Sequence, residues 1–94
     1  MRALFRTTAF KKCVKLLNRR HWDLAPLAVV IDKLAADIPS AELFKDHPLV
    51  GPFFGKRECH VTSVTDDWVL VYHKTDDNRL FLHATGTHAD VFGG

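Results

Sequence analysis

Histidine is the residue type that points most directly to chemistry in this chain. Six of the 94 residues are histidine, and His47, His60 and His88 lie in polar, turn-rich or strand-edge contexts. Imidazole has an unperturbed pKa of about 6.5, so these side chains can take up and release protons near neutrality. Glu58 lies two residues before His60 on an expected strand and shares a face with it, where a carboxylate influences the protonation of the ring.

The other three histidines, His21, His73 and His83, lack such neighbours in the sequence. We interpret them as surface or partly buried structural residues. The expected chemistry therefore concentrates on the first three.

The residue spacing favours neither a metal centre nor a hydrolytic triad. Cys59 and His60 are adjacent on an expected strand and point to opposite faces, and no Cys-x-x-Cys or His-x-x-x-His spacing occurs. No Ser or Cys lies in a Gly-x-Ser-x-Gly elbow. Clustered histidines with carboxylates and basic residues instead suit acid–base cleavage of RNA, which carries its own nucleophile in the 2′-hydroxyl. We therefore expect no metal and no other cofactor.

Positive charge is concentrated in the first twenty residues. The whole chain has a formal net charge of +2, yet its first twenty residues hold seven basic residues and no acidic one. Both a solvated helix face and contact with a polyanion or an acidic partner account for such a run. The residues expected on the outer face of a helix are Lys11, Lys12, Lys15 and Arg19.

The apolar spacing of the first forty residues predicts a strand and two helices. Residues 2–6 predict a short strand, and Thr7 or Thr8 can cap the helix that follows and ends near residue 20. Asp23 is the expected cap of a second helix, whose buried stripe extends to Ile38 and which Pro39 ends. The connection between the two helices is short, so we expect them to be antiparallel.

The last third of the chain changes to strand periodicity. Residues 40–55 contain Pro48, Gly51 and Pro52 and predict an extended loop. Residues 56–62, 68–72 and 79–85 then predict three strands. The order strand, helix, helix and three strands predicts one α+β domain over residues 1–94, with an antiparallel sheet and two helices packed on one face.

Composition places the chain among ordinary soluble proteins. Hydrophobic residues make up 47% and charged residues 26%, which excludes wholesale disorder. No run approaches the ~20 apolar residues of a membrane helix, and the first residues are too interrupted for a signal peptide. Two cysteines are too few for a disulfide framework. We expect a cytoplasmic protein with reduced thiols and no membrane contact.

Four ordered segments carry a resemblance to a known family. They are residues 45–49 (KDHPL), 57–61 (RECHV), 67–72 (DWVLVY) and 85–93 (TGTHADVFG). Together they resemble the signature blocks of YafQ-type toxins, which belong to the RelE/ParE superfamily of type II toxin–antitoxin modules. The resemblance spans the chain from about residue 2 to residue 93, and the expected order of strands and helices agrees with it.

The resemblance implies a RelE-like fold and a metal-independent mRNA endoribonuclease that cuts the codon in the ribosomal A site. It also implies a small cognate antitoxin that covers the active surface in a toxin–antitoxin complex, and operator DNA is reached only through that antitoxin. The positions that match catalytic or substrate-placing residues of the family are His47, His60, Asp67, His88 and Phe92. Glu58 stands where the toxin that names the type has Asp, so the charge is kept and the side chain is one methylene longer. Glu58 and Arg57 are further candidates for substrate binding.

In the mechanism that the resemblance implies, His88 protonates the 5′-oxygen and His47 or Asp67 removes the proton of the 2′-hydroxyl. His60, oriented by Glu58, holds the scissile phosphate or shares the proton transfer. Phe92 and Arg57 contact the substrate, and Phe92 could stack on a base.

Three alternatives stay open from the sequence. The interval between His60 and Trp68 is longer than in the toxin that names the type, so Asp66 could take the place of Asp67. ParE-like members of the superfamily target gyrase but lack the histidine set, and a non-catalytic ribosome- or RNA-binding module would need no histidine chemistry. Lys11 and its basic neighbours on the first helix are the expected contacts with ribosomal RNA.

Overall fold

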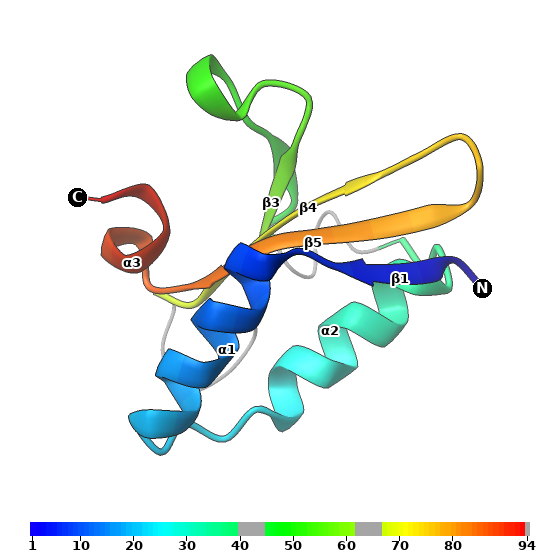
Figure 1. Cartoon of the computed structure of the whole chain (residues 1–94). Helices are drawn as coiled ribbons and strands as arrows, with labels where there is room; N and C mark the ends of the chain where they lie inside the picture. The colour runs from blue at the N-terminus through cyan, green and yellow to red at the C-terminus, as the bar shows by residue number, and fades with distance from the viewer. Residues whose placement is uncertain (40–44, 62–66, 94) are drawn as a thin grey trace.

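The computed structural model describes residues 1–39, 45–61 and 67–93 (Figure 1). The elements, in chain order, are β1 (Ala3–Arg6), α1 (Thr8–Arg19), α2 (Ala25–Ala35), β2 (His47–Pro48), the 3₁₀ helix η1 (Gly51–Phe53), β3 (Arg57–His60), β4 (Val69–Lys74), β5 (Arg79–Gly86) and α3 (His88–Phe92). The fold is α+β, as the sequence predicts.

The sheet is mixed, and the prediction of an antiparallel sheet was wrong for its first strand. The strand order is β1-β5-β4-β3-β2. The pairs from β5 to β2 are antiparallel, whereas β1 runs parallel to β5. More than seventy residues separate the paired positions Ala3 and Arg79. No local pattern could therefore report the direction of this pair, because a parallel pair is joined by a long crossover and not by a turn.

Helices α1 and α2 cover one face of the sheet, as predicted (Figure 1). Phe10 and Leu17 of α1 and Leu34 of α2 are buried there against Leu70 of β4 and Leu82 of β5. Their helical spacing turns one apolar stripe of each helix toward the strands. None of the helices in the described ranges is long and apolar enough to cross a membrane.

The helix boundaries differ partly from their prediction. Thr7 is the cap of α1, and its hydroxyl accepts a hydrogen bond from the amide of Phe10 at 3.1 Å. The N-cap of α2 is Leu24 and not Asp23 as predicted, although Asp23 accepts a hydrogen bond from the Ala25 amide at 3.0 Å. Helix α2 ends before Pro39, because Asp37 adopts a positive φ of 56°. Ile38 is consequently exposed, and its prediction as a buried residue was wrong.

Three short elements were not predicted. The described part of the expected loop, residues 45–55, contains β2 and η1, while residues 40–44 lie outside the described ranges. Helix α3 follows β5 directly and has a capping box between Thr87 and Asp90. Elements of two to five residues are too short to generate hydrophobic periodicity, so the sequence pattern does not reveal them.

We predict that Thr7→Val destabilises the fold by about 1–2 kcal/mol, since it removes both a cap and a long-range hydrogen bond. The Thr7 hydroxyl accepts from Phe10 and also lies 3.0 Å from the carbonyl oxygen of Leu82. Urea unfolding measures the change, with Thr8→Val at the neighbouring exposed position as the matched control. Equal stability of the two variants would contradict this account.

Candidate active site: a buried carboxylate among three histidines

A buried carboxylate lies on the sheet face that α1 and α2 leave uncovered. Glu58 of β3 pairs with Val71 of β4 and with His47 of β2. Cys59, the next residue, enters the core beneath the helices, so alternation along the strand turns Glu58 to the opposite side. Glu58 is only 5% exposed. A carboxylate at this depth is costly unless neighbouring groups compensate its charge.

Three imidazoles surround this carboxylate. Their Nε2 atoms lie 3.8 Å (His47), 3.4 Å (His60) and 3.3 Å (His88) from Glu58 oxygens. The side chains of His47 and His88 are 51% and 47% exposed, whereas that of His60 is 21% exposed. The structure thus brings together the three histidines that the sequence analysis selected, from β2, β3 and α3.

His88 also contacts Asp67. Its Nδ1 lies 2.5 Å from Asp67 Oδ1, and its backbone amide donates to the same oxygen at 3.1 Å. The hydrogen bond to Asp67, reinforced by the charge of Glu58, raises the pKa of His88 above its ordinary value. The same hydrogen bond lowers the pKa of Asp67. His88 therefore keeps its proton to higher pH, as a general acid near neutrality requires.

Asp67, one of the two residues expected to be the site acid, thus contacts His88 directly. The alternative residue, Asp66, lies outside the described residues.

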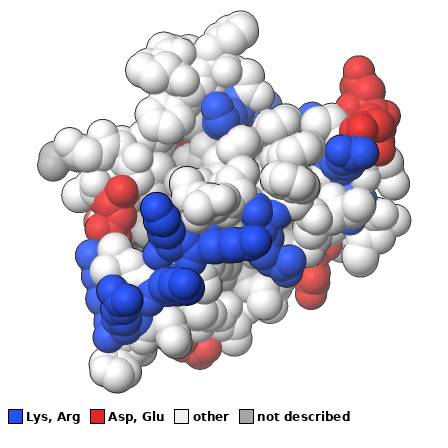
Figure 2. Space-filling view, in the orientation of Figure 1, with Lys and Arg blue, Asp and Glu red and all other residues white. Residues whose placement is uncertain are grey.

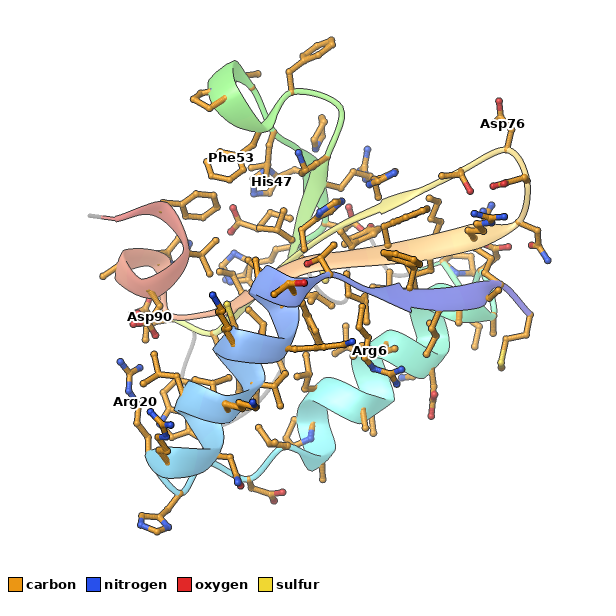
Figure 3. All side chains as sticks on the ribbon, in the orientation of Figure 1. Arg6, Arg20, His47, Phe53, Asp76 and Asp90 are labelled. Atoms are coloured by element: carbon orange, nitrogen blue, oxygen red, sulfur yellow. The ribbon has the colours of Figure 1, made fainter. Side chains whose placement is uncertain are left out.

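An ion pair between the first and last helices holds the segment that carries His88. Arg20 donates to both carboxylate oxygens of Asp90, at 2.7 and 3.1 Å, and Figure 3 shows Arg20 at the end of α1 beside Asp90 of α3. This contact lowers the pKa of Asp90 to about 2. Gly86 makes the approach possible, because its φ is 144° and a Cβ there would lie 2.9 Å from Asp90. Arg20 is a positioning residue that the sequence analysis missed.

Two phenyl rings border the histidines. Phe92 is half-buried and packs edge to face against Phe53, with ring centroids 5.1 Å apart and an interplanar angle of 88°. Its ring also lies 6.1 Å from that of His88. Phe53 projects from η1 near His47 (Figure 3). Sequence periodicity could not select Phe53, because it lies in a short 3₁₀ turn.

Arg57 anchors the strand that carries His47. Its Nε donates to Asp46 Oδ1 at 2.7 Å, and the hydroxyl of Tyr72 donates to the other carboxylate oxygen. Burial and this acidic neighbour raise the pKa of Tyr72. Arg57 remains exposed beyond this bond. Arg57 therefore acts as a structural anchor on the side of β3 opposite Glu58, and its expected contact with substrate stays a prediction.

The cluster has donor atoms that suit a metal ion. One ligand atom each of His47, Glu58 and His60 lies within 4.8 Å of the others, and imidazole with carboxylate is a donor set for zinc or copper. Strand pairing creates this arrangement across thirteen residues, which linear spacing does not reveal. Cys59 adds no nucleophile, because burial raises the pKa of its thiol.

The basic residues of α1 form a separate surface. Basic side chains make a band across the face that carries α1 (Figure 2). The four residues that the sequence analysis selected are all exposed on this helix: Lys11, Lys12, Lys15 and Arg19. No ion pair of theirs appears among the described residues.

Comparison with solved structures places this fold among bacterial toxins of toxin–antitoxin systems. The chain is similar to a crystal structure of YafQ from Escherichia coli BL21(DE3), with a TM-score of 0.86 and 36% identity over 99% of this chain and 100% of the other. A metal-bound toxin from Helicobacter pylori matches with a TM-score of 0.86 and 36% identity over 98% and 100% of the two chains. The E. coli DinJ–YafQ complex gives a TM-score of 0.82 and 38% identity over 98% of each chain.

Sequence comparison defines the family. The mRNA interferase toxin YafQ of E. coli K12 is 40% identical over 85 residues, which cover 89% of this chain and 88% of that protein. Residues 2–93 match the family described as the bacterial toxin of a type II toxin–antitoxin system, YafQ. The chain belongs to the YafQ toxin family, and the resemblance inferred from its sequence is confirmed.

We predict that Asp67→Asn lowers the pKa of His88, because the carboxylate that stabilises the imidazolium becomes a neutral amide. A histidine side-chain titration followed by NMR measures the change. Asp76→Asn, at the tip of the β4–β5 hairpin (Figure 3), is the control and should leave His88 unchanged. Identical His88 titration curves in the two variants would show that Asp67 does not set the proton affinity of this ring.

Proposed function

We propose that this chain is an mRNA endoribonuclease that acts in the ribosomal A site. The names of its E. coli relatives, which are mRNA interferase toxins, support the reaction class. The observation that carries the proposal is the meeting of three imidazoles at buried Glu58, with the pKa of His88 raised by Asp67. In such a site, one imidazole can donate a proton on one side of a bound phosphate while another accepts a proton on the other side.

In the proposed reaction, the 2′-oxygen of the RNA attacks the adjacent phosphorus. His47 accepts the proton of the 2′-hydroxyl, and His88 donates a proton to the departing 5′-oxygen. The P–O5′ bond breaks, leaving a 2′,3′-cyclic phosphate and a 5′-hydroxyl. We assign the base to His47 rather than Asp67, because the hydrogen bond from His88 lowers the pKa of Asp67 and makes it a weak base.

The remaining site residues position the substrate in this proposal. His60 is the least exposed of the three rings and holds the phosphate or shares the proton transfer. Glu58 fixes the rings, and Phe92 stacks on a base, an interaction worth roughly 1–3 kcal/mol in single-strand binders. Arg57 is exposed on the opposite side of β3 and acts only through its bond to Asp46, the residue before His47.

We propose that the reaction needs no metal ion. A mutant toxin from H. pylori whose sequence is 33% identical to this chain has been solved with bound copper. The donor atoms of His47, Glu58 and His60 could hold such an ion here. A bound ion would occupy imidazole lone pairs that proton transfer requires, so it would inhibit the proposed reaction.

The proposed partner is a cognate antitoxin that covers the histidine face. E. coli YafQ has been solved in complex with DinJ, which supports an equivalent toxin–antitoxin complex for this chain. Operator DNA would be contacted through that antitoxin, and the proposed site of action is the cytoplasm, where ribosomes translate mRNA.

We predict that His88→Gln slows mRNA cleavage about 10²- to 10⁴-fold, because it removes the proton donor. Primer extension on a message translated in a cell-free system measures the cut. His21→Asn is the control, since His21 is an exposed histidine at the end of α1 whose positive φ of 62° asparagine tolerates. A chelator that removes transition metals but leaves the Mg²⁺ of the ribosomes should not reduce cleavage by the unsubstituted protein.

Other outcomes of this assay would redirect the assignment. Full cleavage by His88→Gln would show that His88 is not the general acid. Loss of cleavage with the chelator would show that the reaction needs a metal ion. Ribosome binding with intact mRNA would indicate a non-catalytic module. Inhibited DNA supercoiling with intact mRNA would indicate a gyrase-directed toxin.

We predict that the basic face of α1 binds ribosomal RNA and that Lys15→Glu weakens ribosome binding. The salt dependence of binding should also become shallower, by about one unit of slope for each phosphate that the variant no longer neutralises. Co-sedimentation with ribosomes at several salt concentrations measures both effects. Arg79→Glu makes the same charge change at the β4–β5 hairpin and is the control. Equally weakened binding in the two variants would indicate a general charge effect instead of a docking face.

A further inference from the structure

A second group of rings lies on the same sheet face as the histidine cluster. His73 of β4 pairs with Phe81 of β5. Their neighbours Tyr72 and Leu82 are buried beneath the helices, so alternation turns both rings to the uncovered side. Glu58 belongs to this side as well, because its strand partner is Val71, two residues before His73.

A β-bulge adds His83 to this group. The pairing of β4 with β5 skips one β5 residue, His83, between Leu82 and Ala84. A bulge bends the strand and redirects a side chain. The Thr7 hydroxyl lies 3.0 Å from the Leu82 carbonyl oxygen and 3.3 Å from that of His83, so the cap of α1 supplies a donor where the ladder is interrupted.

The three rings pack against one another in a group that we call the ring platform (Phe81, His73 and His83), and Phe5 of β1 lies beside Phe81 with ring centroids 4.8 Å apart. Phe81 and His73 stack with centroids 4.7 Å apart and planes 5° from parallel. His73 Nδ1 lies 2.6 Å from His83 Nε2, while the ring centroids are 4.8 Å apart and the planes differ by 16°. The distance between the two ring centroids is close to the sum of the N···N distance and the radii of the two rings. The centroids and the two nitrogen atoms therefore lie nearly on one line, and the imidazoles meet edge to edge in nearly one plane.

The ring platform is uncharged at neutral pH but lies beside a cation. Burial lowers the pKa of His83 to about 4 and also lowers that of His73, and in both cases the positive charge of Lys56 contributes. One neutral imidazole can then donate its N–H to the lone pair of the other. All three rings are half-buried, so part of their surface reaches solvent. Flat uncharged rings next to a cation are typical of sites that bind single-stranded nucleic acid.

We propose that the paired imidazoles of the ring platform, on the face turned away from Phe81, stack on a nucleobase of the mRNA whose phosphate is cut at the histidine cluster, with Phe81 supporting His73 and Lys56 binding the phosphate backbone between the two sites. This inference rests on the proposed endoribonuclease function. Lys56 and Glu58 lie on one side of the same chain segment, two residues or roughly 7 Å apart, so a single RNA strand spans the platform and the cluster.

The test uses a short fluorescent RNA whose 2′-hydroxyls are methylated, so that it binds but is not cleaved. His83→Leu removes a ring that stacks on the base and should weaken binding about 5- to 100-fold, as loss of one base stack does. Phe81→Leu removes the ring that supports His73 and should weaken binding in the same direction. Phe81→Tyr and His83→Phe keep a flat ring and should bind nearly as well as the unsubstituted protein. With an abasic RNA, the ring-removing and ring-keeping variants should bind alike. Thermal unfolding of each variant confirms that it is folded.

The inference is overturned if ring-removing and ring-keeping variants bind this RNA equally, or if the unsubstituted protein does not bind it. Weakened binding of the antitoxin alone would assign the platform to that protein instead. Because the RNA cannot be cut, the comparison does not depend on catalysis. Failure of the cleavage assay with intact ring-dependent binding would remove the proposed reaction and leave the platform as an RNA-binding surface.

Discussion

The burial of the Glu58 carboxylate is the constraint on which the site depends. Strand alternation sends Cys59 into the helix-side core and leaves Glu58 beneath the uncovered face. A buried negative charge needs compensating neighbours, and three imidazoles from three different elements have a ring nitrogen within 3.8 Å of its oxygens. The same contacts hold the three rings around one point, so in the proposed reaction the stability of the site and its chemistry depend on the same residue.

Contacts elsewhere in the fold position these three rings around the Glu58 carboxylate. Strand pairing of β2 with β3 brings His47 opposite Glu58, and Asp46 ties that short strand to Arg57. His88 begins α3, which the Arg20–Asp90 ion pair fastens to the end of α1. The C-terminal end of α1 thus helps to position His88 on the opposite face of the sheet. The basic outer surface of α1 remains exposed.

The sequence predicted the helices and strands that have a clear hydrophobic periodicity. It did not predict contacts between residues far apart in the chain or elements of only a few residues. The helix stripes, the three C-terminal strands and the residues around Glu58 follow from periodicity and residue chemistry. The parallel pairing of β1 and the contact of Arg20 with Asp90 join positions about seventy residues apart, and no local pattern encodes such distances. His73 and His83 looked isolated because their proximity depends on a strand pair and a bulge.

The hydroxyl of Thr7 joins three parts of the molecule that the chain order keeps apart. It caps α1, follows edge strand β1 directly, and contacts the carbonyl oxygens at the bulge of β5. An edge strand and a first helical turn ordinarily fray independently of a central strand. Here their opening requires breaking contacts to β5, so amide protons in these segments should exchange with solvent as one cooperative unit and not as a loose end.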